Sequence, residues 1–217
     1  MSSSAQPSIR FEKGLEIGYD KPLARFGEAV EIKGGTHFLL ARNGRGKTTL
    51  LRTLAGSLKP LGGQLKVDGF LQYLPEDLRF DAEITPQLIF RTLLGKAQAT
   101  QAMQLAQRIE LDVRKPYGRL STGNRRKTNL IMAELSVRPD QGNVLLLDEP
   151  FSGLDAFARA AFEEIWKNSS DQVVRLVSCH PDYDGMPMPS ALLIEGGTAR
   201  HVGGQGLTWS QLKGLLN

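Results

Sequence analysis

A strand that runs through a glycine-bearing loop into a helix is the sequence feature that most constrains the fold. The run His37-Phe38-Leu39-Leu40 is typical of a buried strand, and the loop 41–46 follows it directly. Leu50, Leu51 and Leu54 then recur at helical spacing. Such a strand–loop–helix segment predicts an α/β fold in which helices cover a sheet.

Two later apolar runs indicate what kind of sheet this is. Residues 144–147 and 173–177 are predominantly apolar strands with a helical stretch between them, as expected for parallel strands buried on both faces. Residues 9–40 contain short alternating strands separated by glycine, whereas 77–135 has helical character. We therefore predict one domain over 1–217, an α/β core with N-terminal β-strands and a helical insertion at about 77–135.

Composition sets the broad class of protein. With 217 residues, 41% hydrophobic and 23% charged, the chain suits one soluble globular domain. Its net charge of +4 fits an anionic ligand or an acidic lipid surface, but the charges are too dispersed to favour nucleic acid alone. One cysteine excludes an internal disulfide, and neither a membrane-spanning run nor a signal peptide is found. We expect a cytoplasmic protein.

The loop after the first long strand has the chemistry of a phosphate cradle. Its backbone N–H groups and the helix N-terminus would face phosphates, the Lys47 ammonium adds charge, and the Thr48 hydroxyl suits Mg²⁺. A chance glycine-rich turn is the alternative. The usual first glycine is replaced by Ala41, which is costly only if that position needs a positive φ. The segment reads Ala41-Arg42-Asn43-Gly44-Arg45-Gly46-Lys47-Thr48-Thr49.

Two further segments carry candidate site residues. Asp148 and Glu149 end a buried strand, where Asp148 suits Mg²⁺ and Glu149 suits the base that activates a water, although such a pair is often a solvated turn. Ser121 and Gly123 open a helix and so form a second anion site, although alone they would be an ordinary N-cap.

Taken in order, these segments resemble the ATP-binding cassette (ABC) ATPase family over essentially the whole chain. The phosphate loop, a segment at the family's Q-loop position, the signature, the Asp-Glu strand end, a D-loop and a switch histidine all follow in sequence. The matching residues are 41–49, Leu74-Pro75-Glu76, Leu120-Ser121-Thr122-Gly123-Asn124, Leu147-Asp148-Glu149-Pro150, Ser152-Gly153-Leu154-Asp155 and Ser178-Cys179-His180.

The resemblance implies a P-loop NTPase (RecA-like) core with an N-terminal antiparallel β subdomain and an inserted helical subdomain. It also implies ATP and Mg²⁺ as ligands, and two cassettes paired head to tail, so that one protomer's signature meets the other's ATP. The catalytic residues would be Lys47, Glu149 and His180, and the metal residues Thr48, Asp148 and Glu76. The nucleotide would contact Tyr19, Asn43, Gly44, Arg45, Gly46, Lys47, Thr48, Thr49, Ser121 and Gly123.

Some positions depart from the family pattern or fit it loosely. Glu76 stands where glutamine is usual and adds negative charge near the phosphates, and Thr122 and Asn124 replace the commoner Gly and Gln of the signature. Tyr19 matches the aromatic residue that stacks on adenine, but an ordinary strand tyrosine is the alternative. Because Lys47, Asp148, Glu149 and His180 are all present, we predict an active ATPase.

Three classes of function fit these motifs to different degrees. The favoured one is the ATP-hydrolysing subunit of a transporter, with a separate permease and a location at the cytoplasmic face of the membrane. A soluble ABC ATPase that acts on nucleic acid or ribosomes is the alternative. Some members of that class carry long coiled coils and others carry two cassettes, and this sequence shows neither feature. A P-loop small-molecule kinase is the third, and the signature and the switch histidine both argue against it. The transported substrate and its direction are not encoded in these motifs.

Overall fold

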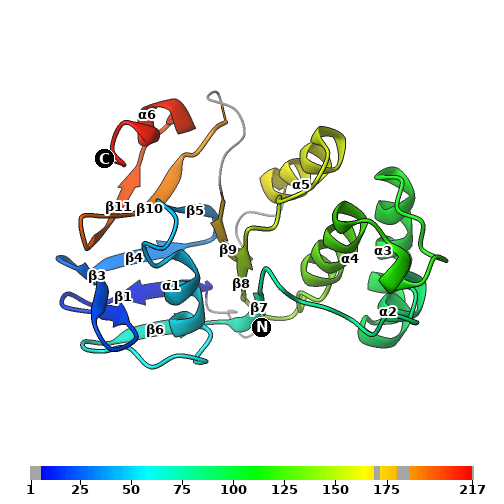
Figure 1. Cartoon of the computed structure of the whole chain (residues 1–217), viewed down its shortest axis with the longest axis horizontal. Coiled ribbons are helices and arrows are strands. Elements are labelled where there is room, and N and C mark those ends of the chain that lie inside the picture. The colour runs from blue at the N-terminus through cyan, green and yellow to red at the C-terminus, as the bar shows by residue number, and fades with distance from the viewer. Residues whose placement is uncertain (1–5, 169–171, 180–185, 217) are drawn as a thin grey trace.

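The computed structural model describes residues 6–168, 172–179 and 186–216, and its centre is an eight-stranded sheet (Figure 1). The strand order is β2-β3-β11-β10-β5-β9-β8-β7. The five strands from β10 to β7 are parallel, whereas β2 pairs with β3 and β11 with β10 in antiparallel fashion. The strands are β2 (Glu16–Gly18), β3 (Pro22–Phe26), β5 (Gly35–Ala41), β7 (Phe70–Leu74), β8 (Asn143–Asp148), β9 (Val173–Ser178), β10 (Ser190–Glu195) and β11 (Thr198–Gly203).

A second, three-stranded antiparallel sheet is built from the N-terminal part of the chain. Its order is β4-β1-β6, with β1 (Ser8–Phe11) between β4 (Val30–Lys33) and β6 (Leu65–Asp68). Phe11 stacks on Phe26 of the larger sheet, with 4.6 Å between ring centroids. This is the predicted N-terminal antiparallel layer.

The helices divide between the sheet and a separate cluster. α2, α3 and α4 gather at the end of the molecule opposite β1 and β6, as Figure 1 shows, and they fall within the predicted helical stretch. Thr85 caps α2 by accepting from the Leu88 N–H at 3.3 Å, and Pro86 is the first helical residue, a position that proline favours. The helices are α1 (Lys47–Leu54), α2 (Pro86–Leu93), α3 (Lys96–Arg108), the short 3₁₀ helix η1 (Tyr117–Arg119), α4 (Thr122–Leu135), α5 (Ala156–Asn168) and α6 (Trp209–Lys213).

Two hydrophobic clusters lie on opposite faces of the large sheet, which explains why its central strands are predominantly apolar. Along β8, Val144 and Leu146 pack into the cluster that includes α1, while Leu145 and Leu147 pack into the cluster that includes α4 and α5. Alternate side chains of a strand point to opposite faces, so a strand covered on both sides is apolar at most of its positions.

The sequence pattern missed three elements. β3, β11 and α6 were not predicted, although each lies in the described chain. Of the six residues of β11 only Ala199 is buried, so this strand has no apolar alternation to recognise. It forms because its backbone pairs with β10 and β3.

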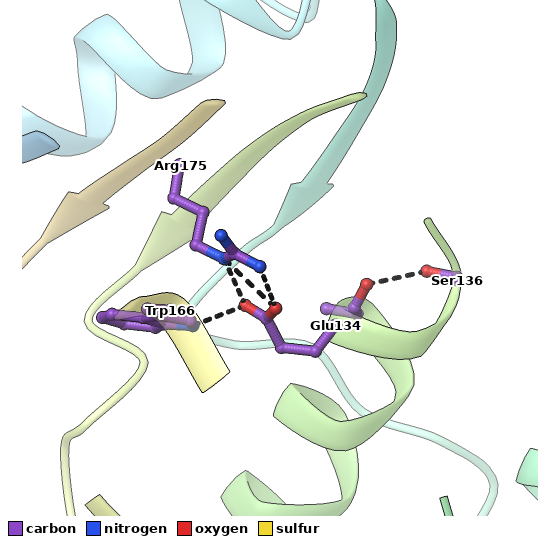
Figure 2. Close-up of polar contacts among 5 residues, drawn as sticks. Glu134, Ser136, Trp166 and Arg175 are labelled. Carbon is purple, nitrogen blue, oxygen red and sulfur yellow. Dashed lines mark hydrogen bonds and ion pairs between the residues drawn. The ribbon is translucent and has the colours of Figure 1, made fainter. Parts of the chain in front are cut away.

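One buried polar network links the helical cluster to the sheet (Figure 2). The Arg175 side chain of β9 and the Glu134 side chain of α4 are 2% and 1% exposed. Arg175 Nη2 donates to Glu134 Oε2 at 2.8 Å, and Trp166 Nε1 of α5 donates to Glu134 Oε1 at 2.8 Å. Because the carboxylate accepts from both neighbours, it joins α4, α5 and β9 at one point.

We expect Arg175→Met to lower the free energy of unfolding by about 3–5 kcal/mol, because it leaves the Glu134 carboxylate buried without its cation. The double variant Glu134→Gln/Arg175→Met should be more stable than Arg175→Met, since the buried charge is gone and an oxygen remains for Trp166. Urea denaturation of the nucleotide-free protein measures both. A double variant no more stable than Arg175→Met would contradict the assigned pairing.

Candidate functional site

The loop after β5 turns into α1 through two glycines with positive φ. Gly44 has φ 74° and Gly46 has φ 109°, a conformation that side chains rarely adopt. Ala41 is the last residue of β5 and is not among the described non-glycine residues with positive φ, so it fits here without that strain. α1 begins without a side-chain cap and without an acidic residue in its first turn. Its N-terminus is therefore suited to bind an anion.

A cavity of about 590 Å³ opens in front of this helix end. The loop and the first turn of α1 form one wall, and acidic residues from the ends of β7 and β8 approach from another side. Tyr19, 53% exposed, lies at the same cavity. The lining residues are Tyr19, Leu23, Arg42, Asn43, Gly44, Gly46, Lys47, Thr48, Thr49, Glu76, Glu149 and Ser152.

Two charged residues that line the cavity form an ion pair. Lys47 Nζ lies 3.5 Å from Glu149 Oε1 and donates to the carbonyl oxygen of Ala41 at 3.3 Å. Both charged side chains are largely buried, at 9% and 14% exposed. The ion pair thus brings the end of β8 and the start of α1 within contact distance.

Asp148 is fixed by hydroxyl groups from the two strands beside β8. Ser178 Oγ of β9 donates to Asp148 Oδ1 at 2.6 Å, and the Tyr73 hydroxyl of β7 donates to Asp148 Oδ2 at 3.4 Å. Burial, followed by the nearby Asp148 charge, raises the pKa of Tyr73 to about 12, so this hydroxyl remains a donor at neutral pH. Asp148 is 1% exposed. Its carboxylate therefore has a fixed orientation before any ligand binds.

Glu149 stands in a backbone conformation that is unusual for its type. Its φ is 47°, and of the described non-glycine residues only Glu110 shares a positive φ. The Glu149 N–H donates to Ser178 Oγ at 2.9 Å and to the Ser178 carbonyl oxygen at 3.2 Å. Strained conformations of this kind persist where surrounding contacts hold them, often at active sites. Ser178 therefore orients both acidic residues.

The signature segment lies outside the 590 Å³ cavity. Ser121 caps α4 by accepting from the Asn124 N–H at 3.2 Å. A β-carbon on Gly123 would come within 2.6 Å of the Gly153 carbonyl oxygen, so the close approach of these two backbones requires glycine. Neither Ser121 nor Gly123 lines the cavity that Lys47 lines.

A salt bridge connects the signature helix with the D-loop. Lys127 Nζ of α4 lies 2.7 Å from Asp155 Oδ2, and the other oxygen of Asp155 accepts from the Ala158 N–H at 2.7 Å. The hydrogen bond from Lys127 is the main cause that lowers the pKa of Asp155 below its usual range. Asp155 thus joins the start of α5 to α4.

Most of the sequence-predicted residues meet in one place. Tyr19, Asn43, Gly44, Gly46, Lys47, Thr48, Thr49, Glu76 and Glu149 line the cavity. Arg45 does not line it; its N–H bonds to the Arg42 carbonyl oxygen at 3.2 Å, and it lines a neighbouring cavity of about 150 Å³. His180 lies outside the described residues.

Sequence reasoning missed the residues that hold the site in shape. Ser178 and Tyr73 orient Asp148, yet each has the sequence pattern of an ordinary strand residue. Leu23, Arg42 and Ser152 also line the cavity. The only signal for Ser178 was its place at the end of an apolar strand, beside the predicted switch histidine.

The oxygen donors at the site fit Mg²⁺. This ion is usually held by one or two carboxylates together with substrate phosphates and water, rather than by a cage of protein ligands. Accordingly, no group of three or more His, Cys, Asp or Glu side chains able to hold a metal occurs within 6–168, 172–179 and 186–216. Thr48 and the oriented Asp148 carboxylate line one adjoining cavity and supply a hydroxyl and a carboxylate oxygen.

In the described part of the chain, no helix has the length and apolar character needed to cross a membrane.

Comparison with known proteins identifies the class. The family model described as ABC transporter matches residues 31–152. The chain is 32% identical over 161 residues to an uncharacterized ABC transporter ATP-binding protein of Methanocaldococcus jannaschii, a match that covers 69% of this chain and 59% of that relative. It is 29% identical over 200 residues to the cytochrome c biogenesis ATP-binding export protein CcmA of Hyphomonas neptunium, covering 89% of this chain and 96% of that protein.

A solved structure has the same fold. An ATP-binding subunit of an ABC transporter superposes with a TM-score of 0.73 at 20% identity, covering 97% of this chain and 99% of that chain. The chain therefore belongs to the ABC transporter family, whose ATP-binding subunits are ATPases that power transport. The family and the fold predicted from the motifs are confirmed.

We expect Ser178→Ala to lower the ATPase rate about 10–100-fold, as is usual when a residue that orients a metal ligand is lost. The variant removes the donor to Asp148 and an acceptor of the Glu149 N–H. Steady-state phosphate release measures the rate. Ser136→Ala is the matched control, since that hydroxyl contacts the Ala133 carbonyl oxygen and the Gln72 side chain and neither acidic residue of the site. Equal rates in the two variants would contradict the role given to Ser178.

Proposed function

We propose that residues 1–217 form a single ABC ATPase domain, with a helical subdomain at about 77–135, that binds MgATP and hydrolyses it to power transport. One observation carries the proposal: a cavity of about 590 Å³ joins the phosphate loop and Lys47 to Glu149, beside the buried Asp148. Anion-binding groups and a carboxylate that can take a proton thus face one space, which is what phosphoryl transfer to water requires.

Each group has a task in the reaction. The backbone of Gly44 and Gly46 and the N-terminus of α1 bind the β- and γ-phosphates, and Lys47 adds a positive charge there. Thr48 and Asp148 would hold Mg²⁺, which neutralises charge on the phosphates when it is bound. Glu149 accepts the proton of the attacking water. For His180, a contact to the γ-phosphate is proposed from the motif resemblance alone, as is a Mg²⁺ contact for Glu76.

Glu149→Gln should lower turnover by ~10²–10⁴-fold, the usual contribution of a positioned base, because the amide cannot accept the proton. ATP affinity should change only a few-fold, since the phosphate loop and Asp148 are intact. Single-turnover hydrolysis and fluorescent-nucleotide titration measure the two quantities. The exposed Glu12→Gln is the control. Hydrolysis by Glu149→Gln at the parental rate would remove Glu149 as the base.

The position of the signature supports pairing of two cassettes. Ser121 and Gly123 do not line the cavity of their own chain's phosphate loop, so a contact between them and ATP calls for a second protomer. The signature Ser121 caps α4, whose N-terminus offers a second anion site. We therefore propose a homodimer or heterodimer with two ATP molecules between the protomers.

The Glu149→Gln protein should sediment as a dimer with ATP and Mg²⁺, and as a monomer with ADP. ADP lacks the γ-phosphate, which is the group that the second signature would contact. Analytical ultracentrifugation at equal protein concentration distinguishes the two species. A Ser121→Ala/Glu149→Gln protein should dimerise more weakly, since the N-cap hydroxyl is lost. A monomer with both nucleotides would contradict the homodimer.

A membrane permease on another polypeptide is the proposed partner, with this chain at the cytoplasmic face of the membrane. The relatives are named as ATP-binding proteins of transporters, one of them an export protein. Leu88 and Leu93 of α2 are 51% and 55% exposed and lie beyond Glu76 in the helical stretch, where an apolar contact with such a partner is available.

A further inference from the structure

A second cavity, of about 360 Å³, adjoins the nucleotide site. It shares Thr48, Glu76 and Ser152 with the first cavity and reaches Asp148. Its remaining wall includes one face of the signature helix α4. The residues that α4 contributes are Thr122, Arg126 and Asn129, which share a face because they are spaced four and three positions apart.

Arg126 is the unusual residue on this face. Its side chain is long and charged, yet the residue is only 7% exposed. Within the described part of the chain, its buried Nη1 has no hydrogen-bond partner. Buried charges are normally paired, because an unpaired one loses its hydration without compensation. A buried guanidinium N–H that lines a cavity and lacks a partner indicates that a ligand or a mobile side chain completes it.

The charged groups around Arg126 show which carboxylate is able to pair with its guanidinium. Burial lowers the pKa of Arg126, and the Arg79 cation acts in the same direction, while the carboxylates of Glu76 and Asp148 oppose it. Asp148 already accepts from Ser178 and Tyr73. Glu76 is exposed at the edge of both cavities. Of these two carboxylates, Glu76 is therefore the one that is able to move.

The backbone next to Glu76 is already attached to the same helix. Asn129 Nδ2 donates to the Leu78 carbonyl oxygen at 3.1 Å, and Asn129 Oδ1 accepts from the Tyr117 hydroxyl at 2.9 Å. Leu78 is two residues beyond Glu76, and Asn129 is one helical turn beyond Arg126. The segment with Glu76 is thereby held alongside the α4 face from which Arg126 projects.

We propose that Arg126 is a positioning residue that holds the Glu76 carboxylate and offsets its negative charge beside the bound phosphates. Glutamate at this position brings an anion to a site that must accept ATP, and a buried guanidinium is its compensating cation. The paired Arg126 and Glu76 side chains together carry no net charge, so the pair does not repel the phosphates of ATP. Glu76 without Arg126 would repel them. The inference rests on the proposed function, because it concerns the same MgATP site.

A double-mutant cycle tests the pairing. Arg126→Gln alone should weaken ATP binding by about tenfold, within the range of coupling seen between groups in contact, because Glu76 loses its cation. Glu76→Gln should bind Mg²⁺-free ATP more tightly than the parent, because Arg126 keeps its charge while the carboxylate that repels the phosphates is gone. The double variant Glu76→Gln/Arg126→Gln should bind ATP only about threefold more weakly than the parent, since no uncompensated carboxylate remains. Fluorescent-ATP titration with and without Mg²⁺ gives the affinities, and steady-state kinetics separates KM from kcat.

Two further variants keep the result interpretable. Arg114→Gln removes one positive charge from an exposed position and should bind ATP as the parent does. Arg126→Lys keeps the charge without the planar fork and should lose less affinity than Arg126→Gln. Thermal melting of each nucleotide-free variant reports folding. If Arg126→Gln does not fold, Arg126→Lys with and without Glu76→Gln forms the cycle, and the same rescue is expected.

The outcomes separate this inference from the function on which it rests. Equal losses of affinity on Arg126→Gln in the parental protein and in the Glu76→Gln variant would overturn the pairing and leave Arg126 with a purely structural role. A parent protein that binds no ATP would instead overturn the proposed function. Rescue of Arg126→Gln by Glu76→Gln, with Arg114→Gln unchanged, supports the assignment.

Discussion

The whole site depends on the register in which four neighbouring strands pair. Ser178 of β9 lies opposite Leu39 of β5 on one side and opposite Asp148 of β8 on the other. The strands therefore end together, and the phosphate loop, the two acidic residues and their hydroxyl donors meet at one edge. Parallel strands have this property in general, because their carboxyl ends share an edge where ligands bind. A shift of one residue in β9 would turn Ser178 to the other face and release both acidic residues.

The charged groups at this edge of the sheet are arranged to suit a ligand that carries several negative charges. The α1 N-terminus and Lys47 supply positive potential, and in the nucleotide-free chain Lys47 lies against Glu149. ATP would bring phosphates to Lys47 and release this carboxylate toward water. Glu149 already stands in a strained conformation with φ 47°, held by two hydrogen bonds to Ser178. Glu149 is therefore oriented in the ligand-free chain, and in the proposed reaction this would reduce the reorganisation needed.

The sequence predicted the parts of the fold whose signal is local. The predominantly apolar runs of β5, β8 and β9 reflect burial on both faces, and the loop before Lys47 reflects a positive φ at two glycines. β3 and β11 escaped prediction because backbone pairing, rather than apolar alternation, defines them. Tyr73 and Ser178 were missed because each acts through a contact with a residue at least 29 positions away. Arg126 was missed because it lines a cavity made by several elements. No local sequence pattern encodes either feature.

The most direct test is a structure of the protein with Mg²⁺ and a non-hydrolysable ATP analogue. We predict that Lys47 Nζ leaves Glu149 and approaches a β- or γ-phosphate oxygen to about 2.7–2.9 Å, the usual length of a charge-assisted hydrogen bond. We also predict that the Glu149 carboxylate faces a water in line with the γ-phosphate. An analogue bound elsewhere, with the Lys47–Glu149 ion pair unchanged, would contradict the central claim that this cavity is the site of ATP hydrolysis.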